Sequence, residues 1–233
     1  MQPFATLPLF LGLTLLSGPA RPGPEIGKPA PAFMLLDVHG KKHSLSDYTG
    51  KPVVLEFVNV TCPYPEDNYK AGVVQKLQKQ YAAKGVVWLS VIITGDQQDQ
   101  YGTNAISLRQ ADSMARAMTE QYGASPAATL IDRHGTAGAA YGTRTSEHLF
   151  VVDPQGVLVY DGALDSPAAR DRAWMESTRQ VPPPYVNYVA AALDATLAGK
   201  SVATAVTMPY GCHQVWDADS SSSGTAAATR PGQ

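Results

Sequence analysis

The chain has 233 residues and a formal net charge of -2, from 18 lysines and arginines against 20 aspartates and glutamates. Nucleic acid or an anionic membrane surface calls for a basic stripe, so we expect neither as a partner. Hydrophobic residues make up 44% of the chain, which is enough for a core, and charged residues 16%. Soluble domains average about 25% charged residues, and this length fits one such domain with appendages.

The beginning of the chain has the composition of an export signal. Residues 4–16 are mostly apolar, fewer than the roughly 20 that a membrane span needs, and small residues follow at Ser17 to Ala20. No lysine or arginine precedes this run, so an uncleaved anchor and a misassigned start stay open. We expect residues 1–20 to be a signal peptide and the protein to be exported (periplasmic or extracellular), without stable membrane insertion after processing.

Two further segments lack an apolar period. Residues 21–31 are rich in proline and glycine and read as a linker, and residues 213–233 are rich in serine, alanine and glycine. Such a tail buries too little apolar surface to offset the entropy of ordering it, so we expect disorder there. The folded domain is therefore expected at residues 32–212.

Within that domain the first half alternates strands with a helix. Residues 32–36 and 41–44 predict a hairpin, a helical turn follows at 45–50, and 53–58 is the continuous apolar run of a strand buried on both faces. One helix is expected next, ending at Gly85, and a second central strand at 86–93. The inward stripe of this helix is Tyr69, Val73, Val74, Leu77 and Tyr81.

The second half repeats the alternation and ends in a hairpin. A polar loop at 95–104 leads to a helix whose expected inward residues are Leu108, Ala111, Met114, Met118 and Tyr122. A short strand is predicted at 128–131, a hairpin at 148–152 and 157–160, and a last helix at 186–197. The inward residues of that last helix are expected to be Val186, Val189, Ala190, Leu193 and Leu197. This order predicts an α/β three-layer sandwich with a mixed central sheet.

A lone cysteine lies where the strand at 53–58 passes into the following helix. Residues 61–65 read Thr-Cys-Pro-Tyr-Pro, and proline in a first helical turn forfeits no hydrogen bond. The free backbone N–H groups and the positive end of the helix dipole at such a site favour a thiolate, which is the nucleophilic form of cysteine. We predict a functional thiol at Cys62, and the alternative is a buried, inert cysteine.

The only other cysteine, Cys212, follows 150 residues later in the turned segment 209–213. The residues leave open whether the two sulfurs meet. A link between Cys62 and Cys212 would contribute about 4–5 kcal/mol in the chain-entropy description of disulfides.

The five histidines invite comparison with metal sites. Cys62, Cys212, His148 and His213 are candidate ligands, but only the adjacent Cys212 and His213 are close in sequence, and neighbours cannot easily bind one ion. His148 begins an apolar strand and reads equally well as a core histidine. No nucleophile-elbow serine, phosphate-binding glycine loop or suggestive carboxylate pair occurs, so no residues support a hydrolase or a nucleotide-binding protein. We expect no metal and no other cofactor.

Several short motifs recur in a fixed order along the chain. They are Gly27 to Phe33, Val53 to Phe57, Cys62-Pro63, and Tyr141-Gly142 ahead of Leu149 to Asp153. Together they resemble the redoxin branch of thioredoxin-like proteins, the group that contains alkyl hydroperoxide reductase and thiol-specific antioxidant proteins. The resemblance covers roughly residues 25 to 212, and the ending looks like a bacterial subgroup with one front-motif cysteine and one near the C-terminus. It implies a thioredoxin fold with Cys62 as the attacking thiol.

The chain departs from the family pattern at three places. Pro65 stands where the dithiol form of the motif has its second cysteine, so no local Cys-x-x-Cys disulfide is available. Leu55 and Asn59 occupy positions where peroxiredoxins usually have proline and threonine or serine. Glu147 fills the slot of the family's cis-proline, and a carboxylate near Cys62 would oppose the thiolate.

Two functions follow from this resemblance. The first is a thiol-dependent oxidoreductase with antioxidant, peroxide- or disulfide-reducing activity, in which Cys62 attacks and Cys212 resolves. Its partners are a small-molecule peroxide, or a protein or small-molecule disulfide, and an unidentified reductant protein. The second is a redoxin-fold binding or structural protein without catalysis, held by a Cys62–Cys212 staple. In both, the residues expected to shape the site are Thr61, Pro63, Asn59 and Glu147.

Overall fold

The computed structural model describes residues 23–59, 62–93, 108–166 and 185–212. The expected signal peptide at 1–20, Thr61, the polar loop at 95–104 and the expected tail at 213–233 therefore lie outside the described residues. None of the helices in the described ranges is long and apolar enough to cross a membrane.

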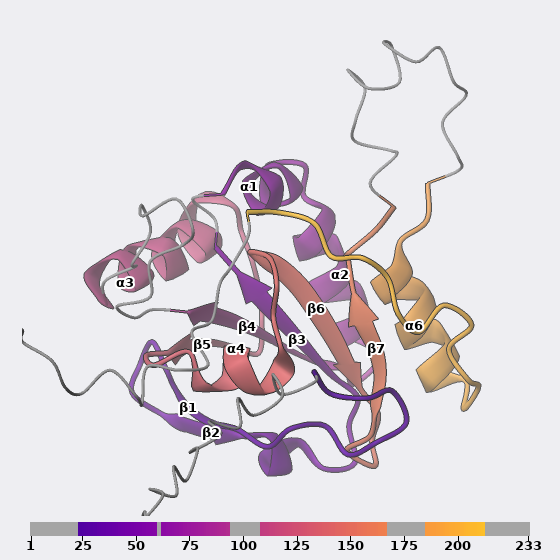
Figure 1. The fold of residues 1–233 in the computed structure, drawn as a ribbon. Coiled ribbons are helices and arrows are strands. Elements are labelled where there is room, and N and C mark those ends of the chain that lie inside the picture. The colour runs from indigo at the N-terminus through magenta and orange to yellow at the C-terminus, as the bar shows by residue number, and fades with distance from the viewer. Residues whose placement is uncertain (1–22, 60–61, 94–107, 167–184, 213–233) are drawn as a thin grey trace, which may run out of the picture.

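A mixed sheet forms the middle layer of the described chain (Figure 1). Its seven strands lie in the order β2-β1-β5-β4-β3-β6-β7, with β3, β4 and β5 parallel and the other neighbouring pairs antiparallel. Their bounds are β1 (Met34–Asp37), β2 (Lys42–Ser44), β3 (Val53–Val58), β4 (Val87–Ile93), β5 (Ala128–Asp132), β6 (Glu147–Val152) and β7 (Leu158–Gly162). The predicted hairpins, central strands and mixed sheet are confirmed.

Helices cover both faces of this sheet and create two separate hydrophobic cores. The helical segments are η1 (Leu45–Tyr48), α1 (Pro63–Lys70), α2 (Val73–Ala82), α3 (Leu108–Arg116), η2 (Ala117–Gln121), α4 (Thr136–Tyr141) and α6 (Tyr188–Leu197). One core joins residues of α1, α2, α3 and α6 to the sheet, and the other joins α4 and the N-terminal strands to its opposite face. Two cores separated by one sheet make a three-layer α/β sandwich, and the fold is thioredoxin-like.

Three helix predictions need correction. The single helix expected after Cys62 is two helices, because Gly72 adopts φ 71 between α1 and α2, a conformation that glycine tolerates at little cost. The short helix α4 was not expected. Of the inward residues predicted for the last helix, Val189 and Leu193 in α6 are buried, whereas Leu197 at its end and Val186, which precedes α6, are exposed.

The N-terminal segment expected as a linker pairs in part with the sheet. The Gly27 N–H donates to the Leu158 carbonyl at 2.8 Å, and the Ala30 N–H donates to the Gly156 carbonyl at 2.9 Å. Pro29 forms an antiparallel bridge with Val157. Packed chain therefore begins several residues before 32.

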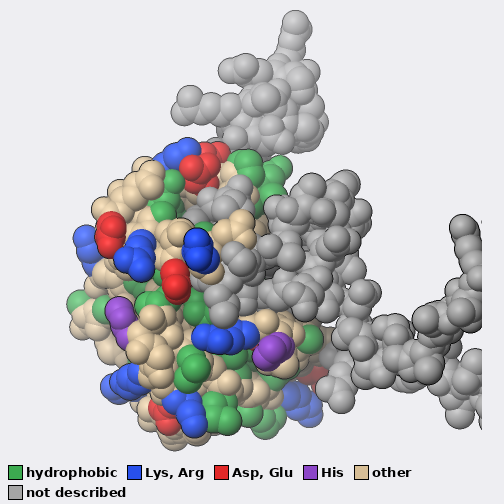
Figure 2. Space-filling model, turned by 90° about the vertical axis from the view of Figure 1, so that its left-hand side faces the viewer, with side chains coloured by type: hydrophobic (Ala, Val, Ile, Leu, Met, Phe, Trp, Pro, Cys, Tyr) green, Lys and Arg blue, Asp and Glu red, His purple; other side chains and the backbone are tan. Residues whose placement is uncertain are grey.

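At the other end, residues 200–212 leave α6 and run along the edge strand β7 to the start of α1 (Figure 1). We call this segment the strap. On the face drawn in Figure 2, side chains of both charge signs are interspersed with hydrophobic ones.

Candidate active site

Cys62 occupies the predicted junction between a buried strand and a helix. β3 ends at Val58, and Cys62 is the N-cap residue of α1, with extended backbone angles (φ -81, ψ 133) and a proline directly after it at position 63. Its N–H donates to the Asn59 carbonyl at 3.0 Å, which closes a tight turn before the helix. Cys62 is only 2% exposed, so its sulfur lies at the positive end of α1 and largely out of water.

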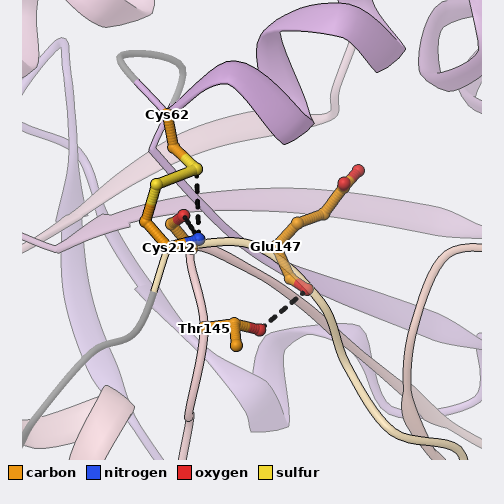
Figure 3. The surroundings of a disulfide bond; sticks show 5 residues. Cys62, Thr145, Glu147 and Cys212 are labelled. Carbon is orange, nitrogen blue, oxygen red and sulfur yellow. Dashed lines mark hydrogen bonds between the residues drawn. A yellow bond between two sulfur atoms is a disulfide. The ribbon is translucent and has the colours of Figure 1, made fainter. Parts of the chain in front are cut away.

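The structure answers the question that the sequence left open, because Cys62 and Cys212 form a disulfide with a Cα–Cα distance of 6.0 Å (Figure 3). The Cys212 N–H points at the Cys62 sulfur, 3.1 Å away, and also at the Ser146 hydroxyl oxygen, 3.1 Å away. The Ser146 N–H donates in return to the Cys212 carbonyl at 2.9 Å. Cys212 is thus fixed by its backbone as well as by its sulfur.

Ser146 connects the strap to the strand that precedes Cys62. The Asn59 N–H donates to the Ser146 carbonyl at 3.1 Å, and Asn59 is itself buried. Gly211 allows the strap to approach this closely, since a Cβ at that position would lie 3.3 Å from both the Glu147 N and the Ser146 hydroxyl oxygen. Its φ of 129 is also one that other residues rarely adopt. A continuous set of backbone hydrogen bonds therefore runs from β3 through residue 146 to Cys212.

Glu147 does not face the sulfur, which corrects the expectation from the sequence. It begins β6, pairs with Val58, and is 1% exposed. Figure 3 shows its side chain turned away from the disulfide, and its carboxylate accepts a hydrogen bond from the Asn68 side chain in α1. Successive side chains of a strand point to opposite faces, so the register with Val58 sends this carboxylate under α1 while its backbone meets the strap.

A second buried carboxylate, Glu56, lies in the middle of β3. Three side chains donate to it: Tyr69 at 2.9 Å, Trp88 at 2.7 Å and Ser90 at 2.8 Å. Burial raises the pKa of Glu56, and the three hydrogen bonds offset that effect only in part. Burial and the neighbouring Glu56 likewise raise the pKa of Tyr69 well above its usual value. Since Tyr69 belongs to α1, this network ties the helix of Cys62 to β3 and β4.

His148 pairs with a carboxylate in the sheet. It is fully buried, and its Nε2 lies 2.6 Å from the Asp161 carboxylate. Its Nδ1 accepts the Arg144 N–H at 3.2 Å, so the ring hydrogen sits on Nε2 and is donated to Asp161. Within the described residues no group of three or more histidine, cysteine or acidic side chains could hold a metal ion, and His213 lies outside them.

Comparison with known proteins places the chain in a family. A profile of the AhpC/TSA family matches residues 26–161. The chain belongs to this family. The matched range contains Cys62 and all of the sheet except Gly162, the last residue of β7, whereas Cys212 and the strap lie beyond it.

Individual relatives agree with this assignment. The chain is 30% identical over 136 residues to the thioredoxin-like protein YneN of Bacillus subtilis. This alignment covers 58% of this chain and 70% of the relative. It is 28% identical over 138 residues to the thiol-disulfide oxidoreductase ResA of Bacillus thuringiensis. This alignment covers 59% of this chain and 69% of the relative.

Solved structures show the same fold. A hypothetical protein from Sinorhizobium meliloti aligns with a TM-score of 0.61 at 24% identity, over 83% of this chain and 96% of that protein. A conserved protein from Geobacillus kaustophilus aligns with a TM-score of 0.64 at 23% identity, over 83% of this chain and 93% of that protein. At these identities the comparison concerns the fold alone.

Sequence reasoning missed several residues around the site. Glu56 had a readable signal, because an acidic residue inside a run of six buried strand residues needs partners for its carboxylate. Ser146 and Asn68 had none, since their contacts join segments 66 and 79 positions apart.

Proposed function

We propose that this family member is an exported thiol-disulfide oxidoreductase whose redox centre is the pair Cys62 and Cys212. The observation that carries the proposal is their disulfide at the N-terminus of α1, where a thiolate on Cys62 would be stabilised. The family supports thiol chemistry, and the ResA relative is named as a thiol-disulfide oxidoreductase. Because Pro65 excludes a local dithiol, the resolving thiol is the distant Cys212.

In the oxidative half-reaction the Cys62 thiolate attacks one sulfur of a substrate disulfide. The substrate S–S bond breaks, its second sulfur leaves as a thiolate, and a mixed disulfide joins Cys62 to the substrate. The Cys212 thiolate then attacks the Cys62 sulfur and releases the other substrate thiolate. The substrate gains two electrons as two thiols, and the protein loses two electrons as the Cys62–Cys212 disulfide.

In the reductive half-reaction a dithiol of a reductant protein opens this disulfide. In this disulfide form Cys62 is 2% exposed, whereas Cys212 is exposed, so the incoming thiolate reaches the Cys212 sulfur. Cys62 is then the leaving thiolate, and both the α1 N-terminus and the Cys212 N–H favour negative charge on its sulfur. A second thiol of the reductant resolves the mixed disulfide on Cys212 and restores the dithiol protein.

Reduction of a peroxide by the same pair is a slower second activity in this proposal. The Cys62 thiolate would attack one peroxide oxygen, release the alcohol, and form a sulfenic acid that condenses with Cys212 and loses water. Leu55 packs in the hydrophobic core and offers no hydrogen bond to a peroxide. The backbone of Asn59 is engaged with Ser146 and Cys62. Disulfide substrates are therefore favoured.

Turnover of a disulfide-bonded protein substrate such as insulin, with dithiothreitol as the reductant, tests the proposal. Cys62→Ser should abolish reduction, and Cys212→Ser should form the mixed disulfide but stop after it. Unchanged turnover in Cys62→Ser would contradict the assignment. A reduction potential below about -300 mV together with no turnover would indicate a structural staple instead.

Export is tested separately. The apolar run and small residues at 4–20 motivate cleavage near Ala20. Mass spectrometry of the protein from its native host should find a new N-terminus there. An intact Met1 on a cytoplasmic species would contradict export to an oxidising compartment.

A further inference from the structure

The strap adds a short stretch of backbone pairing to the free edge of β7. The Asp161 N–H donates to the Ala205 carbonyl at 3.0 Å, and the Thr207 N–H donates to the Asp161 carbonyl at 3.0 Å. Val206 forms a parallel bridge with Asp161 between these two bonds. This pairing lies only five residues before Cys212 along the chain.

The Thr207 side chain makes a second set of bonds at this edge. Its hydroxyl oxygen accepts the Ala163 N–H at 2.9 Å and lies 2.6 Å from the Tyr160 hydroxyl. Tyr160 is fully buried and donates its own hydrogen to the Ala163 carbonyl at 2.6 Å. Thr207 therefore donates to the Tyr160 oxygen, and each of these groups has a partner.

Gly162 provides the space in which Thr207 sits. A Cβ on Gly162 would lie 2.1 Å from the Thr207 hydroxyl oxygen, 2.7 Å from its carbonyl oxygen and 2.9 Å from its backbone nitrogen. Two of these atoms belong to the backbone, so a side chain at 162 would displace the strap itself. Neighbouring Val206 and Met208 point outward and are 58% and 73% exposed.

We infer that Thr207 and Gly162 form an anchor that holds Cys212 beside Cys62 in the reduced protein as well as in the oxidised one. None of the bonds of Thr207 involves a sulfur atom, so opening the disulfide removes none of them. Thr207 is a positioning residue for the thiol pair. The inference rests on the proposed function only in treating Cys62 and Cys212 as a redox centre. The positioning of Cys212 by Thr207 does not depend on catalysis.

The anchor sets how often the Cys212 thiol meets Cys62. With it, the tether is the five residues from Thr207; without it, the tether is the fifteen residues from the end of α6 at Leu197. Effective concentration falls roughly as the -3/2 power of tether length, so losing the anchor lowers it at most about fivefold, because the backbone of Cys212 still bonds to Ser146. A fivefold smaller equilibrium constant for the disulfide raises the reduction potential by about 20 mV.

The test is the equilibrium of the purified chain with reduced and oxidised glutathione, read by alkylation and mass. Thr207→Val keeps the shape but removes the hydroxyl, Gly162→Ala fills the space, and each should lower the equilibrium constant measurably, by at most about fivefold. Thr207→Ser keeps the hydroxyl and should restore the wild-type constant. Val206→Ala, a change on the exposed side of the strap, is the matched control and should leave it unchanged.

Wild-type constants in both Thr207→Val and Gly162→Ala would overturn the anchor, provided that circular dichroism shows them folded. If one variant does not fold, the other decides. Because this equilibrium needs no substrate, its outcome is independent of insulin turnover. A shifted equilibrium constant in these variants without insulin turnover by the wild type would support the anchor and contradict the proposed enzyme. Insulin turnover with unshifted constants would support the enzyme and contradict the anchor.

Discussion

Cys62 is held by its neighbours in sequence, whereas Cys212 is held by residues far from it along the chain. The turn to Asn59 and the start of α1 lie within a few residues of Cys62. The strap that carries Cys212 contacts residues 44 to 66 positions away, in and after β7 and at Ser146. The chemistry of the first sulfur is thus a local property, and the proximity of the second is a property of the assembled sheet.

The two regions also differ in depth. The helix of Cys62 is tied down by Tyr69, whose hydroxyl donates to the buried Glu56. The strap lies over an edge strand, with Val206 and Met208 exposed. Changes under α1 should therefore affect the stability of the fold, and changes along the strap should affect mainly the redox equilibrium.

The comparison is tested most directly by which sulfur of the disulfide an external thiol attacks. Oxidised protein is mixed with isotopically labelled glutathione, quenched in acid, alkylated and mapped by peptide mass. Since Cys62 is buried and Cys212 exposed, at least about ten times more label should appear on Cys212. Label mainly on Cys62 would show that the exposed cysteine is not the point of entry.

On the Cys62 side, Glu56→Ala should destabilise the fold by about 4 kcal/mol. The substitution leaves the buried donors of Tyr69, Trp88 and Ser90 without an acceptor, and each such group costs roughly 1–3 kcal/mol. Urea unfolding measures the loss. Ser90→Ala removes a single donor and should cost about 1 kcal/mol. Equal losses in the two variants would mean that the carboxylate is not the centre of this network.

Glu56→Gln should change how stability depends on pH. The pKa of Glu56 is raised in the folded protein, so the fold binds this proton more tightly than the unfolded chain does. The stabilisation is complete below the unfolded pKa of about 4.3 and is lost as pH rises through the folded pKa. Glutamine does not titrate, so this loss is absent in the variant. Its free energy of unfolding, relative to that of the wild type, should therefore increase from pH 4 to pH 8.

A comparison variant in α1, at Glu66, should show the opposite pH dependence. Hydrogen bonding by Lys70 lowers the pKa of the partly exposed Glu66, so its contribution to stability fades as pH falls. Glu66→Gln should therefore lose stability relative to the wild type at high pH. Parallel pH profiles for Glu56→Gln and the wild type would reject a raised pKa at Glu56.

The local elements could be predicted from the sequence because their signals are local. The apolar run of β3 and the prolines after Cys62 gave the strand-to-helix junction, and strand alternation gave the hairpins. The direction of the Glu147 side chain could not be predicted, because it depends on the register of β6 against β3. The same holds for the strap, whose bonds to Asp161 and Ala163 follow no periodic pattern.

On the strap side, two tyrosine variants distinguish the positioning of Cys212 from the stability of the fold, and their expected effects are the smallest. Tyr210 and Tyr185 donate to the two oxygens of the Asp165 carboxylate, at 2.5 Å and 3.0 Å, but only Tyr210 belongs to the strap. Each Tyr→Phe change removes one partly buried hydrogen bond to a carboxylate and should cost about 1 kcal/mol in urea unfolding.

The redox equilibrium should tell the two tyrosine variants apart. Tyr210 lies two residues before Cys212 and its ring packs 6.1 Å from that of Tyr64, which follows Cys62 by two residues. Without its hydroxyl bond the last turn of the strap is looser, so Tyr210→Phe should lower the glutathione equilibrium constant about twofold. Tyr185→Phe should leave it at the wild-type value. If both variants lower the constant equally, the pair responds to general loss of stability and Cys212 is not positioned by its own segment.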